Sequence, residues 1–394
     1  MNKPLTLITV VAIASCSTSA STGGGGSGGD GSGAASVGAA PTSAGGNGAG
    51  AGGPGPDCSG DPQPAPASPD VVEAISGVYV TTLAGSSNMG DADGLGSTAE
   101  FNNPANIAID AEGRLYIADF DNGLIRSVTT SGLVTTLTGA EGFARPFGLA
   151  VGSSGSLFVG TDFDQSGMNG GLDGGVLWRI DMATGAPTPL AVAAGRPRGL
   201  QAIDDDHLAV SDVGGHDVRL FDLASESFSA FAGLRGCPGF ADGPATDARF
   251  NRPYGVALAS DGSLLVADQL NHRIRRVAPD GYVTTVAGDG RPGLIDGPTA
   301  SSRFNLPQAL AIDEGGNVFV SDVGNHRVRR ISALGIVETV AGDGLLGFLN
   351  GSGTEAQFSG QEGLVVGADG ALYIADGTNG EQVPFHRIRK VTLP

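Results

Sequence analysis

A segment built only of strands recurs six times along this chain, and this repetition limits the possible folds more than any other feature. Each copy holds a Pro-led apolar strand, a second apolar strand ending in Asp, and an Arg-rich third strand. The clearest copies occupy residues 252–276 and 306–330. One such unit cannot bury its own apolar face, so neighbouring units must stack on one another.

The Asp that ends the second strand measures the repeat, because it recurs at intervals of 43 to 56 residues. We place it at Asp119, Asp162, Asp212, Asp268, Asp322 and Asp376. Periods of this length with about four strands per unit are typical of propeller blades and not of helical solenoids. The sequence therefore predicts an all-β fold, a six-bladed β-propeller.

The two ends of the repeat region predict how the ring closes. Innermost strands are expected at 107–109, 149–151, 200–203, 256–258, 310–312 and 364–366, and fourth strands at 134–137, 283–286 and 337–340. The sixth unit lacks a fourth strand, whereas residues 77–85 nearly duplicate the fourth strand at 281–288. We expect residues 78–83 to complete the last blade, which would hide its edge and tie the chain ends together.

The motifs of the two clearest units match a known repeat. Pro-x-Gly, Asp-Gly, Ala-Asp and Asn-His-Arg-hydrophobic-Arg occur at 250–290 and 304–342, and this pattern resembles NHL repeats. The resemblance covers about residues 77–394 and is weakest in units two and three. It implies the same six-bladed propeller but no particular function, since one fold hosts many functions.

The first 72 residues predict export and tethering. Lys3, the apolar run 5–14 and Cys16 resemble a bacterial lipoprotein signal, in which residues 1–15 are removed and Cys16 is acylated. An ordinary secretory signal with a coincidental cysteine is the alternative. Residues 16–72 are rich in Gly, Ser, Ala and Pro, which predicts a disordered tether. The propeller domain would then span 73–394, as a monomer held at the bacterial cell envelope, in the outer membrane, by its lipid alone.

Two further cysteines remain once Cys16 is acylated. Cys58 lies at the end of the tether and Cys237 between units three and four. In an oxidising envelope they could form one disulfide. Two free thiols are the alternative.

The charge of the chain argues against nucleic acid as a partner. The net charge is −19, from 22 basic and 41 acidic residues, so phosphate groups would be repelled overall. The basic clusters Arg273, Arg275, Arg276 and Arg327, Arg329, Arg330 recur at one blade position. We expect them to pair with acidic residues inside or between blades.

The position after the Pro that opens each inner strand tests for catalysis. The NHL-type amidating lyase and six-bladed lactonases, which this chain resembles in fold, hold metals with repeated ligands around the central channel. Here the six positions read Ala105, Phe147, Arg198, Tyr254, Gln308 and Glu362, which is no ligand set. The three histidines His272, His326 and His386 occupy a turn away from the inner strand, where a structural role is expected.

The same six positions describe a ligand if the channel mouth binds one. Phe147 and Tyr254 could stack on a sugar or an apolar side chain, while Arg198, Gln308 and Glu362 could bind polar groups. Six unrelated residues facing water are the alternative. We therefore favour a non-catalytic module that binds a protein, peptide or glycan, with no required cofactor, over a metal-dependent hydrolase or lyase.

Two acidic stretches offer oxygen ligands for calcium. One is 91–94, and the other is the insertion 162–173 with Asp162, Asp164 and Asp173. Neither matches a complete calcium-loop signature. Calcium at the insertion is therefore a secondary expectation.

Overall fold

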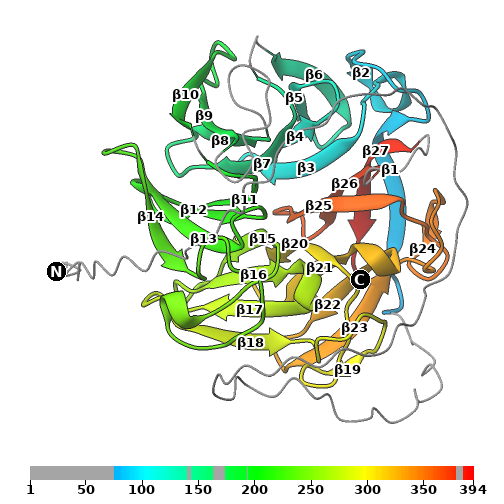
Figure 1. The fold of residues 1–394 in the computed structure, drawn as a ribbon. Helices are drawn as coiled ribbons and strands as arrows, with labels where there is room; N and C mark the ends of the chain where they lie inside the picture. Colours follow the sequence, from blue (N-terminus) through cyan, green and yellow to red (C-terminus); the bar gives the residue numbers. More distant parts are fainter. Residues whose placement is uncertain (1–74, 140–142, 163–173, 193, 379–384) are drawn as a thin grey trace, which may run out of the picture. The chain divides into compact units, whose positions relative to one another are not determined.

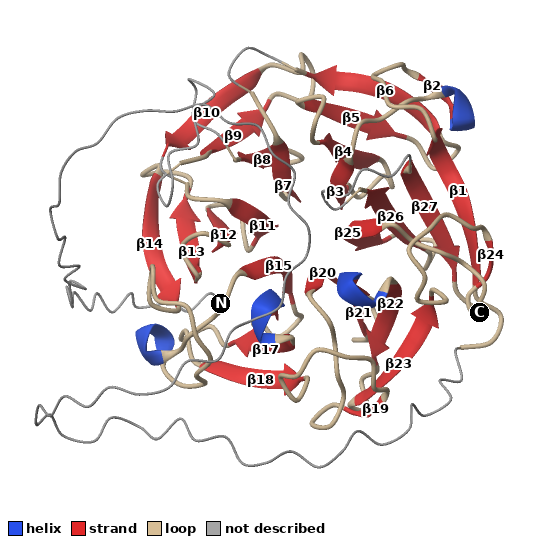
Figure 2. Ribbon diagram, turned by 45° about the vertical axis from the view of Figure 1, so that its right-hand side comes forward, coloured by secondary structure: helices blue, strands red, loops and turns tan. Residues whose placement is uncertain are grey.

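Six antiparallel sheets surround a central axis, as predicted (Figures 1 and 2). The computed structural model describes residues 75–139, 143–162, 174–192, 194–378 and 385–394. Within these ranges no helix is long and apolar enough to cross a membrane. The predicted signal, the tether, Cys16 and Cys58 lie outside the described residues.

Each blade runs outward from the axis through strands in chain order. The innermost strands are β3 (Pro104–Ile109), β7 (Pro146–Val151), β11 (Pro197–Ala202), β15 (Pro253–Leu258), β20 (Pro307–Ile312) and β25 (Gly360–Val366). The second strands are β4 (Leu115–Asp119), β8 (Leu157–Thr161), β12 (His207–Asp212), β16 (Leu264–Asp268), β21 (Val318–Asp322) and β26 (Leu372–Gly377). The third strands are β5 (Leu124–Val128), β9 (Val176–Ile180), β13 (Asp217–Asp222), β17 (Arg273–Val277), β22 (Arg327–Ile331) and β27 (His386–Thr392).

The outer strands confirm the predicted closure of the ring. They are β6 (Leu133–Thr138), β10 (Pro187–Val192), β14 (Ser227–Ala232), β18 (Val283–Ala287), β23 (Ile336–Ala341) and, in the last blade, β1 (Tyr79–Ser86). Strand β1 pairs antiparallel with β27, from Tyr79 opposite Thr392 to Ser86 opposite His386. The first described strand thus completes the sheet that contains the last one.

Short segments before four of the inner strands cover the outer edges. The strands β2 (Gly94–Leu95), β19 (Gly297–Pro298) and β24 (Gly351–Ser352) add a fifth strand to blades one, five and six. Two 3-10 helices, η1 (Gly96–Thr98) and η3 (Ala245–Asp247), belong to these segments. Two others, η4 (Gln269–Asn271) and η5 (Val323–Asn325), lie between the second and third strands of blades four and five. Phe250 and Phe304, which follow such segments, are fully buried between blades.

A buried ion pair holds most blades together internally. In blade four Arg275 Nη1 donates to Asp268 Oδ2 at 2.6 Å and Arg275 Nη2 to Asp242 Oδ1 at 2.6 Å. Arg126, Arg329 and Arg389 make the equivalent bond in blades one, five and six. The predicted pairing with acidic residues is confirmed for Arg275 and Arg329, and also for Arg276 and Arg330. The same prediction is wrong for Arg273 and Arg327, which donate to backbone carbonyl groups instead.

Blade two departs from this scheme, and our placement of its strand-ending Asp was wrong by one residue. Pro146 pairs with Thr161, as Pro104 pairs with Asp119, so Thr161 occupies the Asp position. Trp178, opposite Val159, occupies the Arg position, and its Nε1 donates to Thr161 Oγ1 at 3.1 Å. A neutral hydrogen bond between Trp178 and Thr161 thus replaces the ion pair, and Asp162 is not needed to join the second and third strands of this blade.

Candidate functional site

The side chains predicted to ring the channel mouth line one cavity. Five inner strands have a register shift just after their first residue and β25 has one after its second, Gln361, and such a bulge re-aims the side chain that follows. Five of the six side chains border a central cavity of about 190 Å³: Phe147, Arg198, Tyr254, Gln308 and Glu362. Their exposed fractions lie between 3 and 8%, so only a small part of each side chain is accessible to solvent.

Arg198 is the central group of this cavity. Its Nη2 donates to Asp162 Oδ2 at 2.5 Å, and its guanidinium lies 4.0 Å from the ring centroid of Phe147. Both charged side chains are about 5% exposed. Nevertheless Arg198 Nε and Nη1 and Asp162 Oδ1 have no hydrogen-bond partner among the residues that the structure describes. A buried polar group without a partner costs about 1–3 kcal/mol, so these three atoms form an incomplete network.

Asp162 was not predicted as a partner of Arg198. Its sequence position suggested the strand-ending Asp of blade two, or a calcium ligand. The signal that reveals its role is the third strand of blade two, where Trp178 replaces the Arg that would have bound such an Asp. Arg196 also donates to Asp162, at 3.3 Å, so two arginines of blade three face this carboxylate.

Glu362 contributes a second carboxyl group from the opposite side of the ring. It is 8% exposed and makes no hydrogen bond within the described part of the chain. The pKa of Glu362 is raised to about 7, chiefly by burial and also by the charges of Asp162 and Asp121, against the opposing effect of Arg198. A carboxyl group with a pKa near neutrality exchanges a proton readily at physiological pH.

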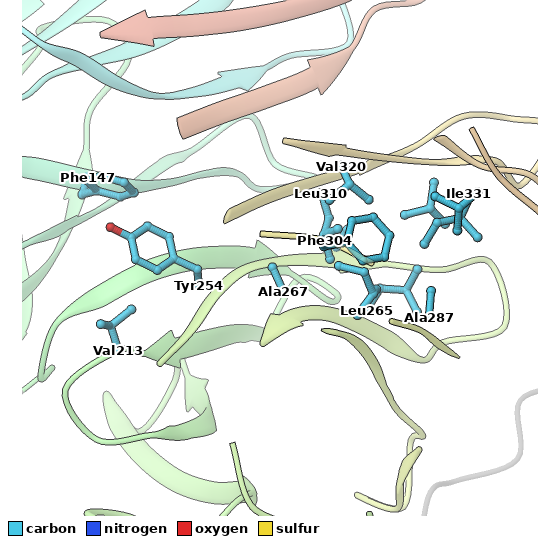
Figure 3. Packing of buried hydrophobic residues seen from close by; sticks show 14 of the residues in the cluster. Phe147, Val213, Tyr254, Leu265, Ala267, Ala287, Phe304, Leu310, Val320 and Ile331 are labelled. Carbon is cyan, nitrogen blue, oxygen red and sulfur yellow. The ribbon is translucent and has the colours of Figure 1, made fainter. Parts of the chain in front are cut away.

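Aromatic rings form one wall of the cavity. Phe147 and Tyr254 meet edge to face with their centroids 5.6 Å apart, and both side chains appear beside one another in Figure 3. Phe120 packs against Phe147 in the same manner at 6.0 Å. Burial raises the pKa of Tyr254 to about 12, so its hydroxyl group stays protonated.

The remaining candidate residues fall outside this cavity or outside the described chain. Asp164 and Asp173 belong to the undescribed ranges. Among the described residues no group of three or more His, Cys, Asp or Glu side chains could hold a metal ion. In the other acidic stretch Asp93 binds Arg126 at 2.8 Å. Cys237 is partly buried and forms no disulfide with a described residue.

The histidines of the turn join neighbouring blades. His272 Nδ1 accepts a hydrogen bond from the backbone N–H of Leu306 in the next blade at 3.2 Å. His216 and His386 do the same for Arg252 and Asn103. For His272 and His386 this agrees with the structural role expected for the turn. His326 departs from it, since its Nδ1 has no hydrogen-bond partner among the described residues.

Comparisons with known proteins agree with this architecture. The family model described as "NHL repeat" matches residues 304–331, in blade five. The chain is an NHL-repeat β-propeller. Human NHL repeat-containing protein 2 is 28% identical over 297 residues, which cover 62% of this chain and 41% of that protein. The propeller therefore spans less than half the length of this relative, as it does for others.

Solved structures share the fold of this NHL propeller at low identity. An auxiliary nutrient binding protein from Bacteroides thetaiotaomicron superposes with a TM-score of 0.63 at 18% identity, over 80% of this chain and 76% of that chain. A gluconolactonase from Xanthomonas campestris reaches a TM-score of 0.53 at 17% identity, over 82% of this chain and 91% of that chain. At such identities the likeness extends to the fold alone.

Proposed function

We propose that this NHL propeller is a non-catalytic binding module of the bacterial cell envelope. Its ligand, part of a protein, a peptide or a glycan, enters the central cavity and contacts Arg198, Tyr254 and Glu362. Acylation at Cys16 tethers the propeller to the outer membrane, and residues 16–72 give it reach. The nutrient-binding description of one structural neighbour is consistent with a binding role outside the cell.

One observation carries this proposal. Arg198, which lines the cavity, and its partner Asp162 keep three buried polar atoms without a hydrogen-bond partner among the described residues. By contrast, Arg275 and Arg329 use all their side-chain nitrogen atoms in hydrogen bonds, and Arg126 and Arg389 leave only Nε without a partner. A ligand that supplied the missing hydrogen bonds would recover the free energy that these groups cost. Residues maintained at such a cost are typical of binding sites.

The test compares two triple variants that remove the same residue types. The ring variant removes three side chains that line the cavity: Arg198→Ala, Tyr254→Ala and Glu362→Ala. The outer variant changes the same residue types on the outside of blades four and five: Arg276→Ala, Tyr282→Ala and Glu338→Ala. Soluble glycans and peptides are screened against both by calorimetry. We expect at least one probe to bind the wild type and the outer variant but not the ring variant. Equal binding to all three proteins would refute a role for the ring.

A metal-dependent hydrolase or lyase is the second candidate. It is favoured by Glu362, because a carboxyl group whose pKa is about 7 suits general acid–base catalysis. Elemental analysis of the purified full chain tests it. Zinc or calcium at one equivalent per chain, lost together with a hydrolytic or eliminating activity, would replace the binding module by an enzyme.

A further inference from the structure

Arg198, which lines the cavity, and its partner Asp162, which lies behind it and not in the lining, both carry atoms without a hydrogen-bond partner among the described residues. Arg198 Nη2 and Asp162 Oδ2 are 2.5 Å apart, so the unpartnered Nη1 of the first side chain and Oδ1 of the second flank one ion pair. A hydroxyl group both accepts and donates hydrogen bonds, so one or two adjacent hydroxyl groups satisfy both atoms. The N–H and C=O of a peptide group point in opposite directions and cannot meet adjacent partners in this way.

Opposite charges already meet beside the cavity. Arg198 pairs with Asp162, which Arg196 also binds, and Glu362 adds a carboxyl group that is partly ionised at neutral pH. An ionised ligand would lose its hydration in this cavity without finding an unmatched counter-charge, which is costly. This pairing therefore favours a neutral ligand over an anion or a cation.

The shape and walls of the cavity restrict the ligand further. Its volume of about 190 Å³ is below the roughly 300–1,000 Å³ usual for drug-sized ligands, so it accepts one small ring. Phe147 and Tyr254 offer aromatic surface beside the polar groups. Aromatic side chains bury the apolar face of a ligand whose edge carries polar groups.

We propose that the cavity binds one neutral sugar residue, free or at the end of a glycan. Arg198 and Asp162 bind adjacent hydroxyl groups, Glu362 binds a hydroxyl group on the other side, and the aromatic pair covers the apolar face of the ring. This inference rests on the proposed binding function and names the ligand class of the same site.

Calorimetry and ligand-observed NMR with the full chain test the ligand class. The neutral probes are methyl glycosides of glucose, galactose, mannose and N-acetylglucosamine. The comparison probes are the corresponding glucuronate and galacturonate glycosides and an N-acetylated, C-amidated dipeptide. We expect at least one neutral glycoside to bind, with its uronate counterpart at least about tenfold weaker.

Matched variants locate the binding. Arg198→Lys and Asp162→Asn are each expected to weaken binding of the neutral glycoside about tenfold, because the first removes guanidinium donors and the second replaces an acceptor oxygen by a donor. Arg276→Lys and Asp261→Asn alter the exposed pair of blade four, whose Nη2 and Oδ2 are 2.7 Å apart, and should change nothing. Tyr254→Phe, which keeps the aromatic ring, provides a further ring variant if one of the first two fails to fold.

The outcomes separate the two proposals. Ring-dependent binding of only the uronate or only the dipeptide would overturn the sugar assignment and leave the binding module intact. Binding of a neutral glycoside that is equally strong in all ring variants would also overturn it. The absence of ring-dependent binding for every probe would remove both proposals.

Discussion

At the scale of single residues, this propeller contains two kinds of buried charge. Arg275 donates to two carboxylates and two backbone carbonyl groups, and its site is complete. Arg198 is also buried but bonds one carboxylate, and two of its nitrogen atoms have no partner within the described part of the chain. The first arrangement holds a blade together, whereas the second leaves capacity for a ligand.

Glu362 should lower the stability of the fold at neutral and higher pH. Its pKa is about 7 in the folded chain against an ordinary value of 4.5, because burial disfavours the ionised form. Stability is therefore highest below the lower value and falls as the pH rises through the higher one. Glu362→Gln should raise the free energy of unfolding by up to about 3 kcal/mol above pH 8 and change it little near pH 4.5.

Urea unfolding at the two pH values measures this difference. Glu112→Gln changes an exposed hairpin position and provides the control. The groups that face Glu362 are Arg198, Asp162, Asp121 and Tyr254, and they are the same in both proteins. A Glu362→Gln effect that is equal at both pH values would show that packing, and not ionisation, sets the cost.

At the scale of elements, the blades are joined by hydrogen bonds from histidine to backbone. Three histidines accept through Nδ1 from the residue that opens the next blade. That residue has a positive φ in each case: 59° at Asn103, 56° at Arg252 and 54° at Leu306. The acceptor thus stabilises a backbone conformation that non-glycine residues rarely adopt.

Protonation of these histidines should loosen the joints between blades. Burial lowers the pKa of His272 below its ordinary value of 6.5. The unfolded chain therefore takes up the proton first, and stability falls as the pH drops below about 6.5. His272→Asn keeps a residue suited to positive φ and should reduce this slope by at most about 1.4 kcal/mol per pH unit, while costing about 1 kcal/mol at pH 7.5.

Thermal unfolding of both proteins between about pH 5 and 7.5 tests this, and carboxyl contributions cancel in the comparison. His207→Asn is the control, since His207 is 40% exposed and binds Asp204 on the same strand end. If stability changes with pH equally in His272→Asn and wild type, protonation of His272 does not weaken the contact between the blades.

The sequence predicted elements better than their exact register. The repeat period and the turn residues located the inner strands, because every blade must bury apolar side chains at equivalent positions. Asp162 was misplaced because blade two is shifted by one residue. Trp178 in place of the usual Arg is the sequence signal for this exception, and the pairing of Pro146 with Thr161 fixes the register. The ring positions were found because they follow a fixed motif, but their burial and the partner of Arg198 depend on three blades at once.

At the scale of the whole molecule, the cavity exists only if the ring is closed. Its lining comes from inner strands of all six blades, so the spacing between Arg198 in blade three and Glu362 in blade six depends on every joint. Strand β1 supplies the last of these joints by pairing along β27, and Val80 and Ala84 are fully buried there. A change that opens the ring of blades should therefore also abolish ligand binding in the central cavity.

Deleting residues 73–85 removes most of β1 and tests this dependence. The loss exposes the edge of β27 and the apolar side chains beneath it, and we expect the cooperative thermal transition to be lost or lowered by more than about 10 °C. A deletion of equal length at 40–52 should leave the transition unchanged. Differential scanning calorimetry measures both, and a deletion of 73–85 that unfolds at the wild-type temperature would show that the five remaining sheets and an open sixth suffice.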